Sequence, residues 1–261
     1  GHCEAQYSLG QKYTEDKSRH KDNEQAIFWL KKAALQGHTF ASNALGWTLD
    51  RGEAPNYKEA VVWYQIAAES GMSYAQNNLG WMYRNGNGVA QDYALAFFWY
   101  KQAALQGHSD AQNNLADLYE DGKGVAQNKT LAAFWYLKSA QQGNRHAQFQ
   151  IAWDYNAGEG VDQDYKQAMY WYLKAAAQES VGAYVNIGYM YKHGQGVEKD
   201  YQAAFEWFTK AAECNDATAW YNLAIMYHYG EGRPVDLRQA LDLYRKVQSS
   251  GTRDVSQEIR E

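Results

Sequence analysis

Residues capable of chemistry are few in this sequence, and they do not form a pattern typical of an enzyme. The 261 residues include two cysteines and seven histidines. The CxxC, HExxH and nucleophile-elbow motifs are absent from the sequence. His193 and His228 fall one repeat apart on the same predicted surface, but a metal ion there would need a third ligand. We therefore predict no enzymatic activity, no cofactor, and no catalytic, cofactor-binding or metal-binding residues.

Charge, glycine spacing and hydropathy argue against nucleic acid, nucleotide and membrane ligands. The formal net charge is −5, so no basic field attracts phosphates or an anionic membrane surface. Most G-x-G segments are followed by an aspartate, which would repel a phosphate. The longest wholly apolar run covers residues 93–100, far below the roughly 20 residues that span a bilayer. We expect neither nucleic acid binding nor membrane insertion.

The cysteine content favours a reducing compartment. Cys3 and Cys214 lie near opposite ends of the sequence and offer no disulfide framework. We therefore expect a cytoplasmic protein. The periplasm is the alternative if a signal peptide precedes Gly1 in the natural protein.

Aromatic residues are the remaining candidates for a functional surface, and their positions follow an internal repeat. Seven segments that begin at an equivalent alanine are spaced 36 or 34 residues apart: Ala5, Ala41, Ala75, Ala111, Ala147, Ala183 and Ala219. After Ala183, the residues Ile187, Met190 and Tyr191 continue one apolar stripe with the period of a helix. A second stripe of the same kind covers residues 204–212. Each unit is therefore predicted to form two helices.

Turn and capping residues separate the two predicted helices of each unit. Paired glycines such as Gly86 and Gly88 end the first helix, because a left-handed backbone costs glycine least. An aspartate or asparagine then occupies the same column in all seven units and is predicted to cap the second helix. These residues are Asp22, Asn56, Asp92, Asn128, Asp164, Asp200 and Asp236. Most second helices end at a glycine, with Glu179 and Asn215 as exceptions.

The repeated pattern resembles the Sel-one-like repeat family, a relative of the tetratricopeptide repeat. It reads L-G-x-x-Y, then G-x-G-V, then A-x-x-W-Y-x-K-A-A, and it is clearest in residues 75–107 and 183–215. The resemblance implies an all-α fold, a right-handed α-solenoid (superhelix) of about seven helix-turn-helix repeats. It also implies a non-catalytic adaptor or scaffold, often bacterial. The sequence departs from the pattern at residues 14–20, which lack the turn glycines, and at 53–55, where two residues are missing.

The register of the repeat predicts a single solenoid domain over residues 1–251 and a degenerate capping helix over residues 252–261. The seven units cover residues 1–37, 38–71, 72–107, 108–143, 144–179, 180–215 and 216–251. Gly1 and His2 align with the repeat-ending Gly37 and His38. We therefore expect a further N-terminal repeat in the natural protein, or self-association through this end.

The tryptophans divide into two columns with different predicted roles. The second-helix column is interpreted as a packing ladder and contains Trp29, Trp63, Trp99, Trp135, Trp171 and Trp207. Trp47, Trp81 and Trp153 instead fall about 120–160° around the first helix from its apolar stripe, at 100° per residue. By the resemblance to tetratricopeptide proteins, this face lines a concave groove. The candidate partner-binding residues are Trp47, Trp81, Asn77, Asn113, Phe149, Trp153, Tyr189, Lys192, Tyr221 and His228.

These features predict a non-catalytic scaffold or adaptor that binds a partner protein, as an extended peptide or a helix, in the concave groove. Exposed aromatic rings bury a large area at low entropic cost when a partner binds. Two alternatives stay open. The same rings could stack on sugars in a glycan- or peptidoglycan-binding module, or they could fill gaps between neighbouring helices.

Overall fold

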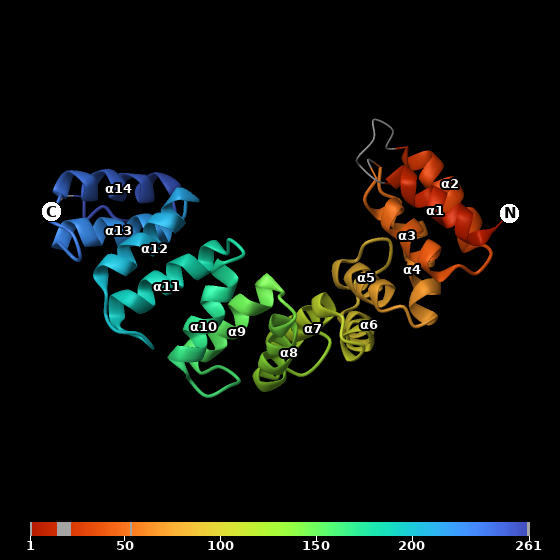
Figure 1. Ribbon diagram of the computed structural model, residues 1–261, viewed down its shortest axis with the longest axis horizontal. Coiled ribbons are helices and arrows are strands. Elements are labelled where there is room, and N and C mark those ends of the chain that lie inside the picture. Colours follow the sequence, from red (N-terminus) through yellow and green to blue (C-terminus); the bar gives the residue numbers. More distant parts are fainter. Residues whose placement is uncertain (1, 15–21, 53, 260–261) are drawn as a thin grey trace. The chain divides into compact units, whose positions relative to one another are not determined.

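The protein is built from paired α-helices. The computed structural model describes residues 2–14, 22–52 and 54–259, and all regular secondary structure in these ranges is α-helical, which confirms the predicted all-α solenoid (Figure 1). The first helices of the pairs are α1 (Cys3–Thr14), α3 (Thr39–Asp50), α5 (Ser73–Asn85), α7 (Ser109–Asp121), α9 (Arg145–Ala157), α11 (Val181–His193) and α13 (Ala217–Tyr229). The second helices are α2 (Asn23–Ala34), α4 (Tyr57–Glu69), α6 (Tyr93–Leu105), α8 (Lys129–Gln141), α10 (Tyr165–Ala176), α12 (Tyr201–Glu213) and α14 (Leu237–Ser250).

The chain divides into two compact units, of which unit 1 ends at Ser139 and unit 2 begins at Ala140. Within unit 1, each helix from α1 to α6 packs against the next one along the chain. Within unit 2, the same holds for the helices from α9 to α14. Short turns join consecutive helices, which therefore run in opposite directions. Contacts between sequence neighbours are typical of a solenoid, in which each repeat is stabilised by the adjacent repeats.

The predicted caps of the second helices are confirmed at all seven positions. In each repeat, the aspartate or asparagine accepts a hydrogen bond from a backbone N–H in the first turn of the helix, over distances of 2.9–3.3 Å. Each bond satisfies a backbone donor that has no partner within its own helix. The regular column therefore fixes where every second helix begins.

The first helices also have side-chain caps, which were not predicted. In four of them, the side chain of the residue before the helix accepts a hydrogen bond from a backbone N–H of the first turn. The accepting atoms are Nδ1 of His38, Nδ1 of His108, Oδ1 of Asn144 and Oδ1 of Asp216. Met72 and Ser180 occupy the same column without a side-chain cap.

In the turns that carry a glycine pair, the two glycines have different roles. Gly86 ends α5 in the left-handed conformation with φ of 72°, as predicted. Gly88 also has positive φ, and a Cβ atom there would overlap the backbone of Tyr57 at the start of α4. The second glycine therefore allows the turn to contact the preceding repeat. The expected departure at residues 14–20 lies largely outside the described residues.

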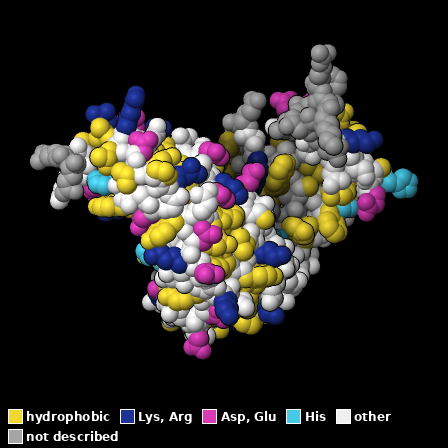
Figure 2. All heavy atoms as spheres, turned by 60° about the vertical axis from the view of Figure 1, so that its left-hand side comes forward, with side chains coloured by type: hydrophobic (Ala, Val, Ile, Leu, Met, Phe, Trp, Pro, Cys, Tyr) yellow, Lys and Arg dark blue, Asp and Glu magenta, His cyan; other side chains and the backbone are white. Residues whose placement is uncertain are grey.

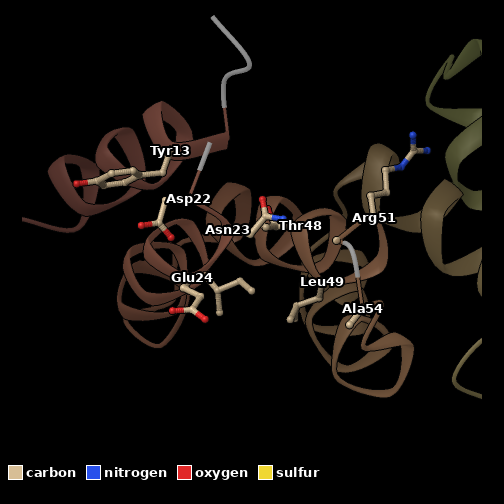
Figure 3. A pocket seen from close by; sticks show the side chains of 10 residues that line it. Tyr13, Asp22, Asn23, Glu24, Thr48, Leu49, Arg51 and Ala54 are labelled. Atoms are coloured by element: carbon tan, nitrogen blue, oxygen red, sulfur yellow. The ribbon is translucent and has the colours of Figure 1, made fainter. Parts of the chain in front are cut away.

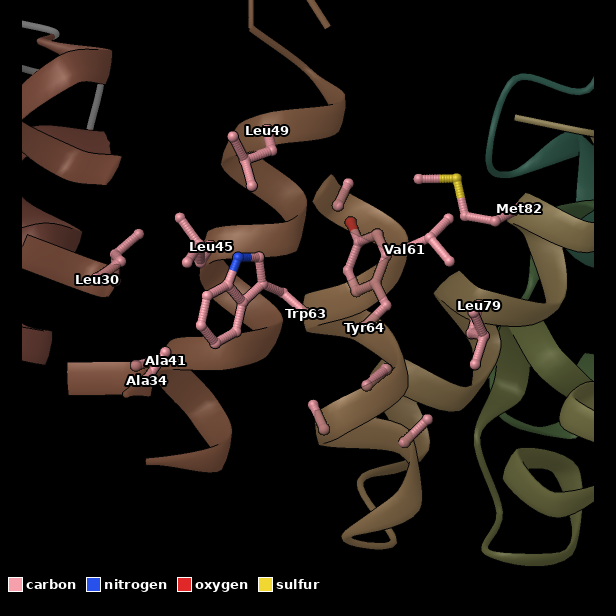
Figure 4. Close-up of a cluster of buried hydrophobic side chains, with 14 of the residues drawn as sticks. Leu30, Ala34, Ala41, Leu45, Leu49, Val61, Trp63, Tyr64, Leu79 and Met82 are labelled. Atoms are coloured by element: carbon pink, nitrogen blue, oxygen red, sulfur yellow. The ribbon is translucent and has the colours of Figure 1, made fainter. Parts of the chain in front are cut away.

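The large side chain after the tryptophan position of each second helix is deeply buried. These residues are only 0–2% exposed and comprise Leu30, Tyr64, Tyr100, Tyr136, Tyr172, Phe208 and, after Leu243 in the last repeat, Tyr244. The tryptophan ladder itself is buried only at Trp63 and Trp171, whereas the other four are half-buried. Figure 4 shows Trp63 and Tyr64 of α4 among apolar side chains of the helices on either side. The tryptophans are therefore partly or fully buried, as the predicted packing ladder requires, but the column that follows them is more deeply buried.

The C-terminal segment after α14 covers the end of the core. Val255 is fully buried in a cluster with Tyr244 and Val247. Between Val255 and Ile259 a single backbone hydrogen bond of 3.1 Å closes one turn. Within the described residues, which end at 259, the expected capping helix over residues 252–261 consists of this one hydrogen-bonded turn. Its capping role stays a prediction.

Candidate protein-binding surface

The outward side of the odd-numbered helices, here called the first-helix face, carries exposed aromatic rings. Trp47, Trp81, Trp153 and Tyr189 are 43%, 43%, 45% and 46% exposed, respectively. They occupy the same position in α3, α5, α9 and α11, on the side opposite the apolar stripe that packs against the second helices. Their predicted exposure is confirmed. On the face that Figure 2 shows, apolar side chains are interspersed with charges of both signs.

The asparagines of this face partly join neighbouring first helices. Asn78 donates through Nδ2 to Oδ1 of Asn43 at 3.2 Å, and Asn114 donates in the same way to Asn77 at 3.0 Å. Asn77 is half-buried, whereas Asn113 is only 8% exposed. The expectation that Asn113 stands on the surface is therefore wrong.

Charged residues of unit 1 are held by the buried tyrosines. Nη1 of Arg84 lies 3.0 Å from Oδ2 of Asp117, and the Tyr136 hydroxyl donates to the other oxygen of Asp117 at 2.9 Å. The Tyr64 hydroxyl donates to Oδ2 of Asp50 at 2.7 Å. Burial raises the pKa of Asp50, although the Tyr64 hydrogen bond and the Arg51 charge act in the opposite direction. These contacts join charged side chains of the first helices to the buried tyrosines.

In unit 2, three predicted site residues are held by contacts within the chain. Lys192 forms an ion pair of 2.7 Å with Glu231, and its side chain is only 11% exposed. The Tyr221 ring lies beneath the guanidinium of Arg253, whose central carbon is 3.7 Å from the ring centroid. The half-buried Phe149 packs against the Tyr172 ring, with 5.7 Å between centroids.

The expected free surface at Lys192 and Tyr221 is therefore wrong for a physical reason. Glu231, which follows α13, pairs with Lys192, and Arg253 of the C-terminal segment lies over the Tyr221 ring. The half-buried His228 stacks on Tyr229 with 4.5 Å between ring centroids. Trp153 and Tyr189 remain as the exposed aromatic residues among the candidates of unit 2.

Among the hollows of unit 1, two differ in character. The larger one, of about 980 Å³, is lined by residues at the ends of α1, α2 and α3, including Tyr13, Asp22 and Thr48 (Figure 3). It is not part of the first-helix face. The smaller one, of about 310 Å³, opens on that face between α3 and α5 and is bordered by Asp50 and Trp81.

The described residues show neither a metal site nor a membrane span. Among them, no group of three or more histidine, cysteine, aspartate or glutamate side chains could hold a metal ion. None of the helices that they form is long and apolar enough to cross a membrane.

The paired helices, the repeated core columns and the exposed first-helix face define the chain as an α-solenoid repeat protein. The family model "Sel1 repeat" matches seven segments, which cover residues 3–38, 39–72, 73–108, 109–144, 145–180, 181–216 and 217–246. The chain therefore belongs to the Sel1 repeat family. Sel1 repeats generally mediate protein interactions, and the family is typically non-catalytic.

Bacterial proteins of known structure share this fold over most of the chain. The crystal structure of c5321, a protective antigen present in uropathogenic Escherichia coli strains, is 36% identical with a TM-score of 0.89, over 96% of this chain and 54% of that one. A Sel1 repeat protein from Oxalobacter formigenes is 32% identical with a TM-score of 0.75, over 82% of this chain and 86% of its own.

A shorter stretch matches a curated protein almost completely. The Sel1-repeat-containing protein YbeQ of E. coli strain K12 is 99% identical over 78 residues, which are 30% of this chain and 24% of YbeQ. The chain thus spans about half of c5321, and its match covers about a quarter of YbeQ.

Proposed function

We propose that this chain is a non-catalytic scaffold or adaptor that binds a partner protein, as an extended peptide or a helix, on its first-helix face. The observation that carries this proposal is the exposure of large aromatic rings at one position of the repeat. Trp47 and Trp81 lie on successive first helices of unit 1, and Trp153 and Tyr189 on successive first helices of unit 2. Rings of this kind are the residues most often responsible for binding energy in protein interfaces.

The surroundings of two rings favour a protein partner over a glycan. The Arg51 guanidinium lies 5.4 Å from the Trp47 ring centroid, and the His193 ring lies 4.1 Å from that of Tyr189. A sugar would need to stack on a free ring face, and these contacts occupy one face of each ring. A protein partner can use the ring edges and the adjacent polar groups as well.

The proposal is tested by replacing Trp81 and Trp153 with alanine in the full chain. If the partner buries both rings, their loss should weaken partner binding at least thirtyfold, because losing one such residue typically costs about 2 kcal/mol. Helicity and melting should change little, because both rings are exposed. Partner capture is measured by affinity purification with quantitative mass spectrometry, and folding by circular dichroism.

A matched control removes equally exposed rings from the second helices. Phe98 and Tyr170 are 48% and 49% exposed, so their replacement with alanine removes a similar apolar area elsewhere on the molecule. This control should retain the partner. Retention of the partner by the Trp81→Ala/Trp153→Ala variant, or a large drop in its melting temperature, would contradict the proposal.

A further inference from the structure

The hollow between α3 and α5 contains a carboxylate that is only half satisfied. Its lining residues are Asp50, Arg51, Asn77, Asn78 and Trp81. The Asp50 side chain is nine-tenths buried, at 10% exposed. Its Oδ2 atom accepts the Tyr64 hydroxyl, whereas its Oδ1 atom has no hydrogen-bond donor among the described residues. A buried anionic oxygen without a donor is unfavourable and attracts a cation.

The chain's own nearby cation does not satisfy this oxygen. Nε of Arg51 lies 3.7 Å from Oδ1 of Asp50, which is too long for a hydrogen bond. The Arg51 side chain is 67% exposed, and its guanidinium lies over the Trp47 ring instead. Burial accordingly raises the pKa of Asp50 despite this neighbour.

The next pair of first helices, α5 and α7, carries a complete ion pair at the equivalent positions. Arg84 holds in α5 the position that Asp50 holds in α3, and Asp117 holds in α7 the position of Trp81 in α5. There, both oxygens of Asp117 have partners, since one binds Arg84 at 3.0 Å and the other accepts the Tyr136 hydroxyl. The chain therefore supplies a guanidinium between α5 and α7 and leaves a carboxylate beside an indole ring between α3 and α5.

We propose that the hollow receives an arginine side chain of the partner, whose guanidinium donates to Oδ1 of Asp50 and stacks against the indole of Trp81. This inference rests on the proposed function, because the hollow opens on the first-helix face. Asn78 uses its amide nitrogen to bind Asn43, which leaves its carbonyl oxygen as a further acceptor. A guanidinium fits better than an ammonium, because it is planar, stacks on aromatic rings and presents several donors in one plane.

Other cations fit this hollow less well. A divalent metal ion binds several oxygen ligands, commonly from more than one carboxylate. Asp50 is the single carboxylate among the lining residues of the hollow. One carboxylate beside an aromatic ring is instead the environment in which a basic side chain is held by charge and stacking together.

The test titrates the full chain with two short peptides that differ only in charge. The first is acetyl-Ala-Arg-Ala-amide, and the second carries citrulline, which has nearly the same shape as arginine but no charge. Binding is followed by the indole N–H resonance of Trp81, assigned through the Trp81→Phe variant. The arginine peptide should shift this resonance with saturation, and the citrulline peptide should bind at least tenfold more weakly.

Two variants with the same change of charge identify the carboxylate. Asp50→Asn should weaken binding of the arginine peptide at least tenfold without lowering the melting temperature, because the substitution removes a desolvated charge. Asp121→Asn removes an exposed carboxylate of α7 that pairs with Lys123, and it should leave binding unchanged.

The inference is overturned if citrulline and arginine peptides bind equally, or if Asp50→Asn binds as the unmodified chain does. A lower melting temperature for Asp50→Asn would also overturn it, because the Asp50 carboxylate would then already be stabilised within the chain, by Tyr64 or Arg51. These results leave the proposed function standing if Trp81→Ala/Trp153→Ala still loses the partner. Loss of arginine binding in Asp50→Asn, with partner capture retained by the tryptophan variant, would instead contradict the proposed function alone.

Discussion

At the scale of single residues, His108 combines a structural role with a dependence on pH. Its Nδ1 atom accepts the backbone N–H of Ala111 at 3.3 Å and caps α7. The ring also contacts Tyr74, with 4.6 Å between centroids. Burial lowers the pKa of His108, because the charged imidazolium would lose hydration. Protonation would also remove the lone pair that accepts the cap.

Replacing His108 with asparagine should therefore reduce the loss of stability in mild acid. The neutral imidazole stabilises the folded state fully above the ordinary histidine pKa of about 6.5, and this contribution is lost as the pH falls through the lower folded pKa. An asparagine can cap without titrating, as Asn144 does for α9 at 3.0 Å. Urea unfolding at pH 7.5, 6 and 5 measures the effect. An equal loss of stability with pH in both proteins would contradict this role.

The sequence pattern did not predict which of two adjacent aromatic residues in a second helix is the more deeply buried. Adjacent aromatic residues such as Trp99 and Tyr100 differ by about 100° around a helix, and either could have been the deeper one. The structure favours the tyrosine, because a small residue of the first helix faces its ring. A Cβ atom added to Gly80 would lie 2.7 Å from the Tyr100 ring. The glycine in the L-G pair was the available signal for the buried tyrosine column.

At the scale of helices, the helix ends follow simple capping rules. The aspartate and asparagine column and the turn glycines could be predicted, because each satisfies a local backbone requirement. The caps of α3 and α7 could not be predicted from the same rule, because His38 and His108 are not of the residue types that usually cap a helix. The local rules were therefore sufficient for the number and order of the helices.

Two second helices end without glycine, and one of these ends should be improvable. Glu179 and Asn215 both have φ of 61°, in the left-handed region that disfavours most side chains. Glu179→Gly should raise the free energy of unfolding by about 0.5–1 kcal/mol, since glycine adopts this conformation without strain. Asn215→Gly should gain less, because asparagine tolerates this region. Denaturant unfolding of both variants is the measurement, and a loss of stability in Glu179→Gly would refute the assignment of strain.

At the scale of the whole molecule, neighbouring repeats within each unit stabilise one another, and the last repeat also contacts the C-terminal segment. Val255 fills the position next to Tyr244 and Val247, and Arg253 covers Tyr221. The segment therefore occupies a surface that another repeat would otherwise bury. Neither the coverage of Tyr221 nor that of Lys192 was predicted, because both depend on elements beyond the repeat that contains them.

Deleting the chain from Thr252 onward should lower the melting temperature and promote self-association. The deletion exposes the apolar surface that Val255 covers, and such surfaces bind other apolar surfaces in water. Calorimetry and light scattering after size-exclusion chromatography measure the two effects. Val255→Asp, which keeps the chain length, should act in the same direction. An unchanged melting temperature and a monomeric state in both variants would rule out the capping role.

The central claim is that partners bind to the first-helix face, and site-specific photo-crosslinking in cells tests it most directly. A photoreactive phenylalanine derivative is placed at position 81 or 153 of the first-helix face, or at position 98 or 170 of the second helices. These four sites have similar exposure, 43–49%, so the chance of random collision is matched. We predict covalent adducts with the same partner protein from positions 81 and 153 and none from positions 98 and 170. Adducts from 98 and 170, with none from 81 and 153, would contradict the account.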